Sequence, residues 1–340
     1  MANSTLNAIR TKVRRITRCP STAQLSTADL DEYINTFVLY DFPEHLRLFS
    51  LREDFTFVCN PYQDIYVTDT SLATTDPLYD FKNRYITVHP PVYIAGYQRM
   101  YSQSPEQFFG IYPKTNNIAS IGFVGDGVTT AFSGFLTNVP VLANNVLFDS
   151  IDSSGNGLAL VDYPTSNTTG SLGLPGVPQV LPVPYGFINY VTGAFTVNFP
   201  TAPGDSQQIN SQTVPYVPSL PQALLYFDDK FTLRPVPDQP YRVQFQVYRR
   251  PTELLDSGQK PELEQWWQWI AIGSAKKLFE DRLDMDSVAL IMPEYKKQET
   301  LVLRRTIVEN TNQRTATIFT EQIGPWSGLG NTGGFGNNTF

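Results

Sequence analysis

The spacing of apolar residues predicts that the chain begins with helices. In residues 4–17, apolar side chains recur three or four positions apart and therefore share one helical face. Pro20 ends this helix, because a proline inside a helix removes a hydrogen bond and clashes with the preceding turn. A second helix begins near Ser26, where Asp29 follows three positions later as in a capping box, and it stops or bends at Pro43.

Alternating apolar and polar residues then replace the helical spacing and predict β-strands. Residues 54–98 contain runs rich in aromatic and β-branched side chains. Pro90 and Pro91 place the last of these runs at a sheet edge, because proline cannot donate to a neighbouring strand. Alternation returns after residue 220, in ALLYFDD, KFTLRPVPD and YRVQFQVYRR. We expect these later runs to form antiparallel strands that complete the sheet begun at 54–98.

An abrupt change in composition marks an insertion. Positions 115–229 contain no Lys, Arg, His, Cys, Trp or Met, so all 25 basic residues lie outside this window. Short apolar runs separated by turn residues fill it, a pattern typical of a β-sandwich or a small barrel. The expected fold class is α+β, with a discontinuous core of helices and antiparallel strands from residues 1–115 and 221–310. Residues 116–220 would form an inserted, sandwich-like all-β domain that folds alone.

Three stretches of the insertion have signatures of their own. Thr192-Gly193 separates two apolar runs and predicts a β-hairpin. Residues 164–184 lack periodicity and predict a long surface loop. Residues 152–157 (DSSGNG) resemble the start of a calcium loop, but Tyr163 stands where such a loop needs a glutamate, so we interpret them as a turn.

The C-terminal part of the core is predicted to be helical. Pro261 opens a tryptophan-rich helix, and a second helix covers about residues 286–310 with an interruption at Pro293. The first of these helices has two apolar faces, although packing against one core needs only one. We therefore predict that its second face meets another subunit or the second C-terminal helix. That second face carries Trp269, Ile272 and Phe279. The neighbouring tryptophans could also form a sugar platform, but their helical spacing is more typical of a core or a subunit interface.

Both ends of the chain have a composition that suits docking to a partner. Residues 311–340 form an extended tail rich in Gly and Asn that cannot bury itself alone, yet its aromatic residues can anchor in grooves of a neighbour. The expected anchors are Phe319, Trp326, Phe335 and Phe340. A disordered end without a partner is the alternative.

The first helix has a basic face, with Arg10, Arg14 and Arg15, which we expect to dock to an acidic protein surface. Contact with DNA and a merely solvated face remain open for these arginines.

The sequence contains little that points to catalysis. It has two histidines and two cysteines, and it lacks the loops and motifs of nucleotide-binding, hydrolase and metalloprotease sites. Glu280, Asp281, Asp284 and Asp286 could hold a cation, but a helix junction capped by Asp286 explains them more simply. We therefore expect no enzyme, no catalytic residue, no cofactor and no metal. No apolar run approaches the roughly 20 residues that span a bilayer, and the net charge of −7 excludes general nucleic-acid binding.

Two blocks resemble the head-to-tail adaptor proteins of short-tailed bacteriophages. One is residues 25–49, and the other is residues 231–284, continuing into EYKKQETLVLRR. In the second block, a strand, Pro-x-Pro, another strand and Arg-Pro-x-x-Leu precede the tryptophan-rich helix with its small residues Gly273, Ser274 and Ala275. The insertion is similar to β-modules of many phage virion proteins.

This resemblance implies a structural protein of the virion. The core would be a connector core, and copies of the chain would form a homo-oligomeric ring, usually dodecameric, below the portal protein. The ring would extend the DNA channel and carry the downstream tail or nozzle protein, after assembly in the host cytoplasm. Double-stranded DNA would pass through the lumen without specific binding, which suits an acidic chain because each basic contact to phosphate adds affinity.

Two other classes of function stay open. A receptor-binding or tail-fibre module would use the β-rich insertion, and it would form trimers rather than a ring. A tail-associated polysaccharide lyase or hydrolase would need paired carboxylates, which can meet in space from any two positions. The mass of the assembled particle separates the first alternative from the adaptor.

Overall fold

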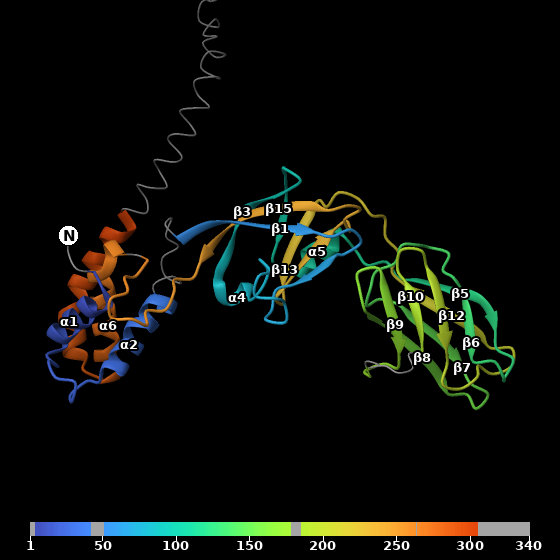
Figure 1. The fold of residues 1–340 in the computed structure, drawn as a ribbon, viewed down its shortest axis with the longest axis horizontal. Helices are drawn as coiled ribbons and strands as arrows, with labels where there is room; N and C mark the ends of the chain where they lie inside the picture. The colour runs from blue at the N-terminus through green and yellow to red at the C-terminus, as the bar shows by residue number, and fades with distance from the viewer. Residues whose placement is uncertain (1–3, 42–50, 178–184, 263, 305–340) are drawn as a thin grey trace, which may run out of the picture. The chain divides into compact units, whose positions relative to one another are not determined.

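The computed structural model describes residues 4–41, 51–177, 185–262 and 264–304 (Figure 1). The fold is a mixed α+β fold that contains two large curled sheets. Contacts between Cα atoms divide the chain into a helical unit and a β-rich unit. The helical unit comprises residues 1–53, 83–87 and 247–340, and the β-rich unit comprises residues 54–82 and 88–246. Three of the four divisions fall within strands and one falls within a short helix, and neither unit is continuous in sequence.

The helical unit is built around one apolar core. Its described helices are α1 (Leu6–Thr17), α2 (Thr27–Thr36), the π-helix η1 (Phe37–Asp41), the 3₁₀ turn η3 (Glu264–Trp266), α6 (Trp267–Asp281) and the helical residues 285–304. Leu6, Ile9 and Val13 of α1 are fully buried, as their spacing predicts. The predicted cap of the second helix is confirmed, because Ser26 Oγ accepts a hydrogen bond from the Asp29 amide at 3.1 Å.

Three details of the C-terminal helices differ from the prediction. Regular α-helix starts at Trp267 rather than at Pro261, because a 3₁₀ turn precedes it. Residues 285–304 remain helical through Pro293, since apolar side chains before and after the proline pack on the core of the helical unit. The cap at the helix junction is Asp284 rather than Asp286, because Asp284 Oδ1 accepts from the Ser287 amide at 3.1 Å.

The first sheet of the β-rich unit has seven strands in the order β1-β15-β3-β4-β13-β14-β2. These strands are β1 (Arg52–Cys59), β2 (Ile65–Val67), β3 (Tyr85–Ile94), β4 (Tyr97–Ser102), β13 (Ala223–Phe227), β14 (Lys230–Arg234) and β15 (Tyr241–Arg249). The late strands therefore complete the sheet begun at 54–98, as expected. Its concave side holds a cluster of phenylalanines, and the Phe57 ring lies 5.6 Å from the Tyr66 ring of the opposite edge strand. The sheet thus curls until its two edges face each other across the core.

Two expectations for this sheet are wrong. The strand β3 lies between β15 and β4 rather than at an edge. Its pairing with β4 uses only Val92–Ile94, after the two prolines, so neither proline has to donate to β4. The pairing of β13 with β4 is parallel, so the sheet is not purely antiparallel. The short helices α4 (Phe81–Arg84) and α5 (Pro105–Ile111) accompany this sheet.

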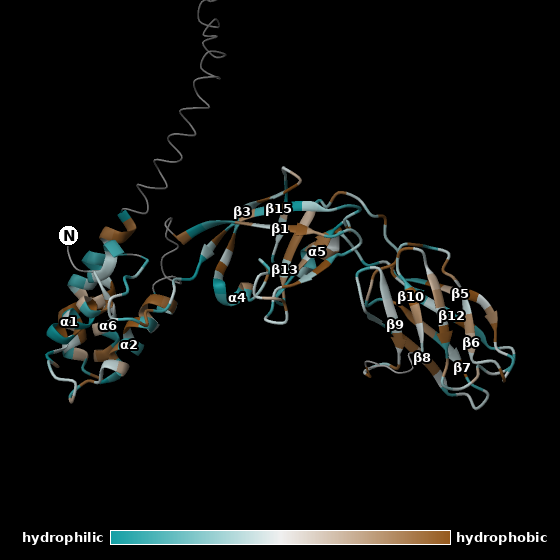
Figure 2. Cartoon of the chain, viewed as in Figure 1, coloured by the Kyte–Doolittle hydropathy of each residue, from teal (hydrophilic) through white to brown (hydrophobic). Residues whose placement is uncertain are grey.

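The second sheet lies within the window that lacks basic residues. Its order is β5-β12-β7-β8-β9-β10-β11-β6, and all neighbouring strands in it are antiparallel. The strands are β5 (Asn117–Val124), β6 (Ala131–Phe135), β7 (Leu147–Ile151), β8 (Gly157–Pro164), β9 (Thr169–Gly173), β10 (Gly186–Asn189), β11 (Ala194–Asn198) and β12 (Gln208–Thr213). Figure 2 shows brown, apolar residues in these strands, and buried residues alternate with more exposed ones along β8 and β12. The rings of Phe123 and Phe132 lie 5.6 Å apart and bring the edge strands β5 and β6 together. The sheet is thus a single curled layer. Independent folding of residues 116–220 stays a prediction.

The predicted hairpin is confirmed, but the predicted loop is wrong in part. Strands β10 and β11 pair around Thr192-Gly193, where Gly193 has a positive φ of 73°. Residues 164–184 were expected to form a loop, yet Thr169–Gly173 is a strand that pairs with both β8 and β10. The sequence TGSLG contains two glycines, no aromatic residue and a single β-branched residue, Thr169, so its neighbours hold it in the sheet. Residues 152–157 form the turn between β7 and β8, and Asp152 Oδ1 accepts from the Ser154 and Asn156 amides.

A buried carboxylate fixes the interior of the eight-stranded sheet. Asp162 is 5% exposed, and its oxygens accept hydrogen bonds from the amides of Asn144 and Val146 and from the Tyr190 hydroxyl at 2.7, 2.9 and 2.8 Å. Burial raises the pKa of Asp162, whereas the Tyr190 bond lowers it. Because the carboxylate is removed from water, each donor stabilises its ionised form.

We expect Tyr190→Phe to lower the free energy of unfolding by about 1.5–3 kcal/mol at neutral pH, the range for a hydrogen bond to a charged group. Loss of this donor should raise the pKa of Asp162 further. The cost should therefore shrink as pH falls through the raised pKa of folded Asp162, where this carboxyl becomes protonated, and grow as pH rises above it. Urea titrations across pH measure this. Tyr97→Phe is the control, since Tyr97 is 61% exposed, and equal losses in both variants would contradict the prediction.

Candidate subunit interface

The helical unit contains a groove of about 470 Å³ at the end of its helix bundle. Its walls come from the C-terminal ends of α1 and α6 and from the start of the helical residues 285–304. The lining residues are Ile16, Thr17, Arg18, Phe279, Arg282, Asp284, Ser287, Leu290 and Ile291. Phe279 is 8% exposed and belongs to the core, so the groove opens directly onto the apolar interior of the unit.

Large apolar side chains stand in solvent beside this groove. Leu290 lines it and is 83% exposed, while Leu283 and Met285, in the junction that leads to it, are 82% and 65% exposed. Placing three such side chains in water is unfavourable, because burying each would gain roughly 1.5–3 kcal/mol. Clustered exposure of this kind is typical of a surface that another protein covers.

The rim of the groove is basic. Arg18 is exposed at the end of α1, and Arg282 follows α6. One guanidinium nitrogen of Arg282 lies 3.2 Å from the Cys19 sulfur, which holds the side chain beside the groove. Asp284 is the acidic group of the lining, and its hydrogen bonds with Ser287 lower its pKa. Apolar walls with cations at the rim suit a partner surface that is apolar at its centre and acidic around it.

The three residues predicted to form a subunit contact occupy different places. Trp269 and Ile272 are 1% and 4% exposed within this single chain. The Trp269 ring lies 5.2 Å from the Phe37 ring and 5.7 Å from that of Tyr295, in the second C-terminal helix. These contacts favour that helix as the partner of the second apolar face. Among the three predicted residues, Phe279 is the one that lines the groove, and its contact with a neighbouring subunit stays a prediction.

Close packing on α6 also explains a small residue. A Cβ atom added at Gly273 would lie 2.2 Å from two ring atoms of Phe37. Phe37 is itself 2% exposed and packed against Trp269, so its ring has little room to move. Gly273 therefore lets α6 approach η1 closely.

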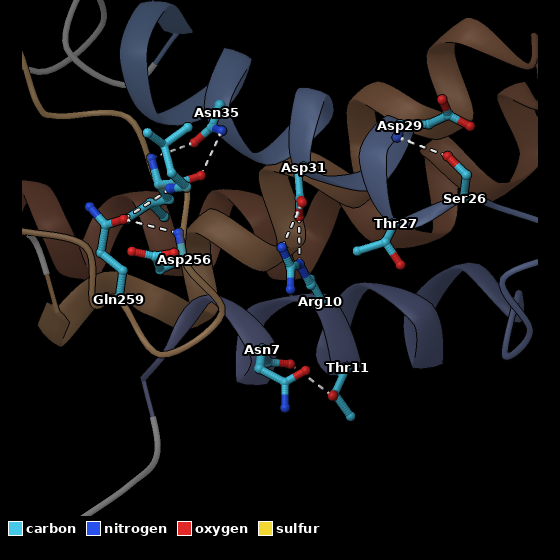
Figure 3. A network of polar contacts seen from close by, with 12 residues as sticks. Asn7, Arg10, Thr11, Ser26, Thr27, Asp29, Asp31, Asn35, Asp256 and Gln259 are labelled. Carbon is cyan, nitrogen blue, oxygen red and sulfur yellow. Dashed lines mark hydrogen bonds and ion pairs between the residues drawn. The ribbon is translucent and has the colours of Figure 1, made fainter.

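Arg10 and Arg14, two arginines of the basic face predicted to dock a partner, are engaged within the helical unit, and Figure 3 shows the contact of Arg10. Arg10 donates two hydrogen bonds to Asp31, of 2.5 and 2.6 Å, and joins α1 to α2. Arg14 donates to the carbonyl oxygens of Cys19, Ser21 and Leu25, which fixes the connection between the helices. Arg15 is exposed and remains accessible to a partner. Partner docking by these three arginines stays a prediction.

The side chains of Asn35 and Gln259 hold the segment that leads into α6 by hydrogen bonds to its backbone (Figure 3). The Asn35 side chain donates to the Leu254 carbonyl at 3.0 Å and accepts from the Leu254 amide at 2.9 Å. Gln259 Oε1 accepts from the amides of Leu255 and Asp256. Sequence reasoning missed both residues, because Asn35 is a polar residue of α2 and Gln259 lies in a loop, and neither contributes to an apolar pattern.

The remaining predicted docking residues, Phe319, Trp326, Phe335 and Phe340, lie outside the described residues. Within the part of the chain that the structure describes, no group of three or more His, Cys, Asp or Glu residues could hold a metal ion. In the same part, none of the helices combines the length and the apolar character needed to cross a membrane. No family model matches the chain, and no curated protein matches it.

Proposed function

We propose that the chain is a structural subunit of a tailed-phage head-to-tail connector. Copies form a ring below the portal protein, extend the DNA channel and carry the next tail component in the virion. The two blocks that resemble adaptor proteins support this proposal. Within the described residues, the first contributes α2 and η1, and the second contributes β14, β15 and α6. Both blocks therefore contribute helices to the core that forms the groove.

The observation that carries the proposal is the groove with its exposed leucines. A ring needs a heterologous interface, in which one surface of a subunit fits a different surface of the next. The groove provides one half of such an interface, and we assign its occupant as a neighbouring copy of the chain. The net charge of −7 is compatible with a lumen along which DNA slides, because few basic groups are available to hold phosphates.

We expect Leu290→Asp to weaken self-association at least about tenfold, because burying one leucine at an interface contributes roughly 1.5–3 kcal/mol. Monomer stability should change little, since this side chain is 83% exposed. Sedimentation velocity and electron microscopy, with the protein alone and mixed with its portal, measure the assembly. Leu255→Asp is the matched control, because Leu255 is 72% exposed in the same unit and does not line the groove.

A ring that forms equally well with Asp at position 290 would refute the groove as the interface. A particle with the mass of a trimer would favour the receptor-binding or tail-fibre alternative. Exposed aromatic residues on the eight-stranded sheet are the observation in favour of that alternative.

A further inference from the structure

Two phenylalanines stand exposed on the same face of the eight-stranded sheet. Phe135 on β6 is 73% exposed and lies opposite Ala194, while Phe187 on β10 is 56% exposed and lies opposite Thr196. Ala194 and Thr196 are two positions apart on β11, so all four side chains share one face. The intervening Phe195 is 3% exposed and points into the core, which identifies the shared face as the outer one.

A shallow hollow of about 490 Å³ lies on this outer face. Its walls combine the Phe187 ring with hydroxyl, amide and small side chains. These are Thr165, Thr169, Asn189, Ala194 and Thr196. The lining contains no charged side chain. From the strand spacing and rise, Phe135 stands about 12 Å from Phe187, across β11.

The polar groups of the hollow are held in place before any ligand arrives. Thr196 Oγ1 accepts from the Phe187 amide at 3.2 Å, and Thr165 Oγ1 donates to the Thr169 carbonyl at 3.1 Å. Asn189 Oδ1 accepts from the Val191 and Thr192 amides, which leaves its Nδ2 as the atom that can donate to a ligand. Groups fixed in this way lose little freedom on binding.

Below the hollow, the backbone is pinned by the buried pair of Asp162 and Tyr190. A Cβ atom added at Gly170, which lines the hollow, would collide with the Tyr190 hydroxyl. The 2.8 Å bond to Asp162 keeps that hydroxyl in place. The floor is therefore a rigid surface rather than a loop that rearranges.

The charge of the region selects the class of ligand. Residues 115–229 contain no Lys, Arg or His, so a phosphate, sulfate or carboxylate would find no cation on this sheet. An aromatic ring beside oriented hydroxyl and amide groups presents an apolar face together with fixed hydrogen-bonding groups. A neutral sugar ring has the same two features, with C–H groups on its faces and hydroxyls at its edge. A protein partner fits less well, because the two exposed phenylalanines stand about 12 Å apart on a shallow face, whereas the centre of a protein interface is closely packed.

The geometry points to a binding site for a neutral saccharide on the outer face of β9, β10, β11 and β6. Phe187 stacks on one sugar ring above the hollow, and Thr196 and Asn189 hydrogen-bond to its hydroxyls. Phe135 supports a further unit of the same oligosaccharide. The site does not depend on ring formation, and it gives the insertion a role separate from assembly.

The test uses the full chain with maltohexaose, cellohexaose, mannohexaose and chitohexaose, with a heparin hexasaccharide as the anionic probe. Saturation-transfer NMR and calorimetry measure binding. We expect at least one neutral probe to bind with a dissociation constant on the order of a millimolar or lower. The Phe187→Ala variant should bind that probe at least tenfold more weakly. Phe135→Ala should weaken binding less. Phe227→Ala is the matched control, since Phe227 is 52% exposed on the other sheet, and it should change nothing.

Three results would overturn the proposal. They are no binding of any neutral probe, equal binding by the Phe187→Ala variant, and preferential binding of heparin. Loss of self-association in the Phe187→Ala variant without any saccharide binding would identify the face as a protein contact instead. Because the assay is read out on the soluble chain, its failure leaves the connector proposal untouched.

Discussion

Asp64→Asn should lower the free energy of unfolding of the seven-stranded sheet by about 3–5 kcal/mol, the usual cost of breaking a buried ion pair. Asp64 Oδ2 accepts a hydrogen bond from Arg234 Nη2 at 2.9 Å, and the two side chains are 11% and 8% exposed. Asparagine would leave the guanidinium charge buried without its counter-charge. The loss should appear in urea titrations and in faster hydrogen exchange of the β14 amides.

A double variant distinguishes the net contribution of the ion pair to stability from the cost of leaving one charge buried without a partner. Asp64→Leu combined with Arg234→Met removes both charges and should cost much less than either single change, because well-packed apolar residues can replace a buried pair. The exposed pair of Lys230 and Asp228, with side chains 45% and 71% exposed, is the control. Asp228→Asn should cost less than about 1 kcal/mol. A loss from Asp64→Asn as small as that would contradict the prediction.

Local signals in the sequence were sufficient for much of the fold. The first two helices carry an apolar stripe and a capping residue, so the pattern and the cap agree on the same structure. The hairpin at Thr192-Gly193 follows from its turn residues. The completion of the first sheet by β13, β14 and β15 was expected because both groups of strands flank the insertion, although the parallel pairing with β4 carries no local signal.

Elements that depend on their neighbours could not be found in this way. The strand β9 has weak strand propensity, and β12 (QINSQT) is polar, so partners on both sides determine them. In the candidate interface, periodicity placed Trp269, Ile272 and Phe279 on one face but could not show that Tyr295 of the second C-terminal helix packs on Trp269. The pairing of Arg10 with Asp31 spans 21 residues and needed the tertiary structure. A count of basic residues could not distinguish Arg10, in this partly buried contact, from the exposed Arg15.

We expect Trp269→Ala to lower the stability of the helical unit by about 3–5 kcal/mol, the range for removing a buried tryptophan. Its ring contacts Phe37 edge-on, with an interplanar angle of 74°, and lies beside Tyr295. Alanine would leave a cavity between α6, η1 and the second C-terminal helix. The measurement is thermal and urea unfolding at protein concentrations low enough to keep the chain monomeric, so that assembly does not contribute.

Comparison with two other aromatic residues distinguishes folding from assembly. Trp267→Ala is the matched control, since Trp267 is only partly buried at the start of the same helix, and it should cost clearly less. Phe279→Ala should destabilise the monomer and also weaken ring formation, because Phe279 belongs to the core and lines the groove. If Trp269→Ala left the monomer stable but abolished the ring, Trp269 would be an interface residue. Its burial between Phe37 and Tyr295 would then not describe the free chain. Loss of monomer stability with assembly retained in the folded fraction would assign Trp269 to the core and leave the groove around Phe279 and Leu290 as the subunit contact.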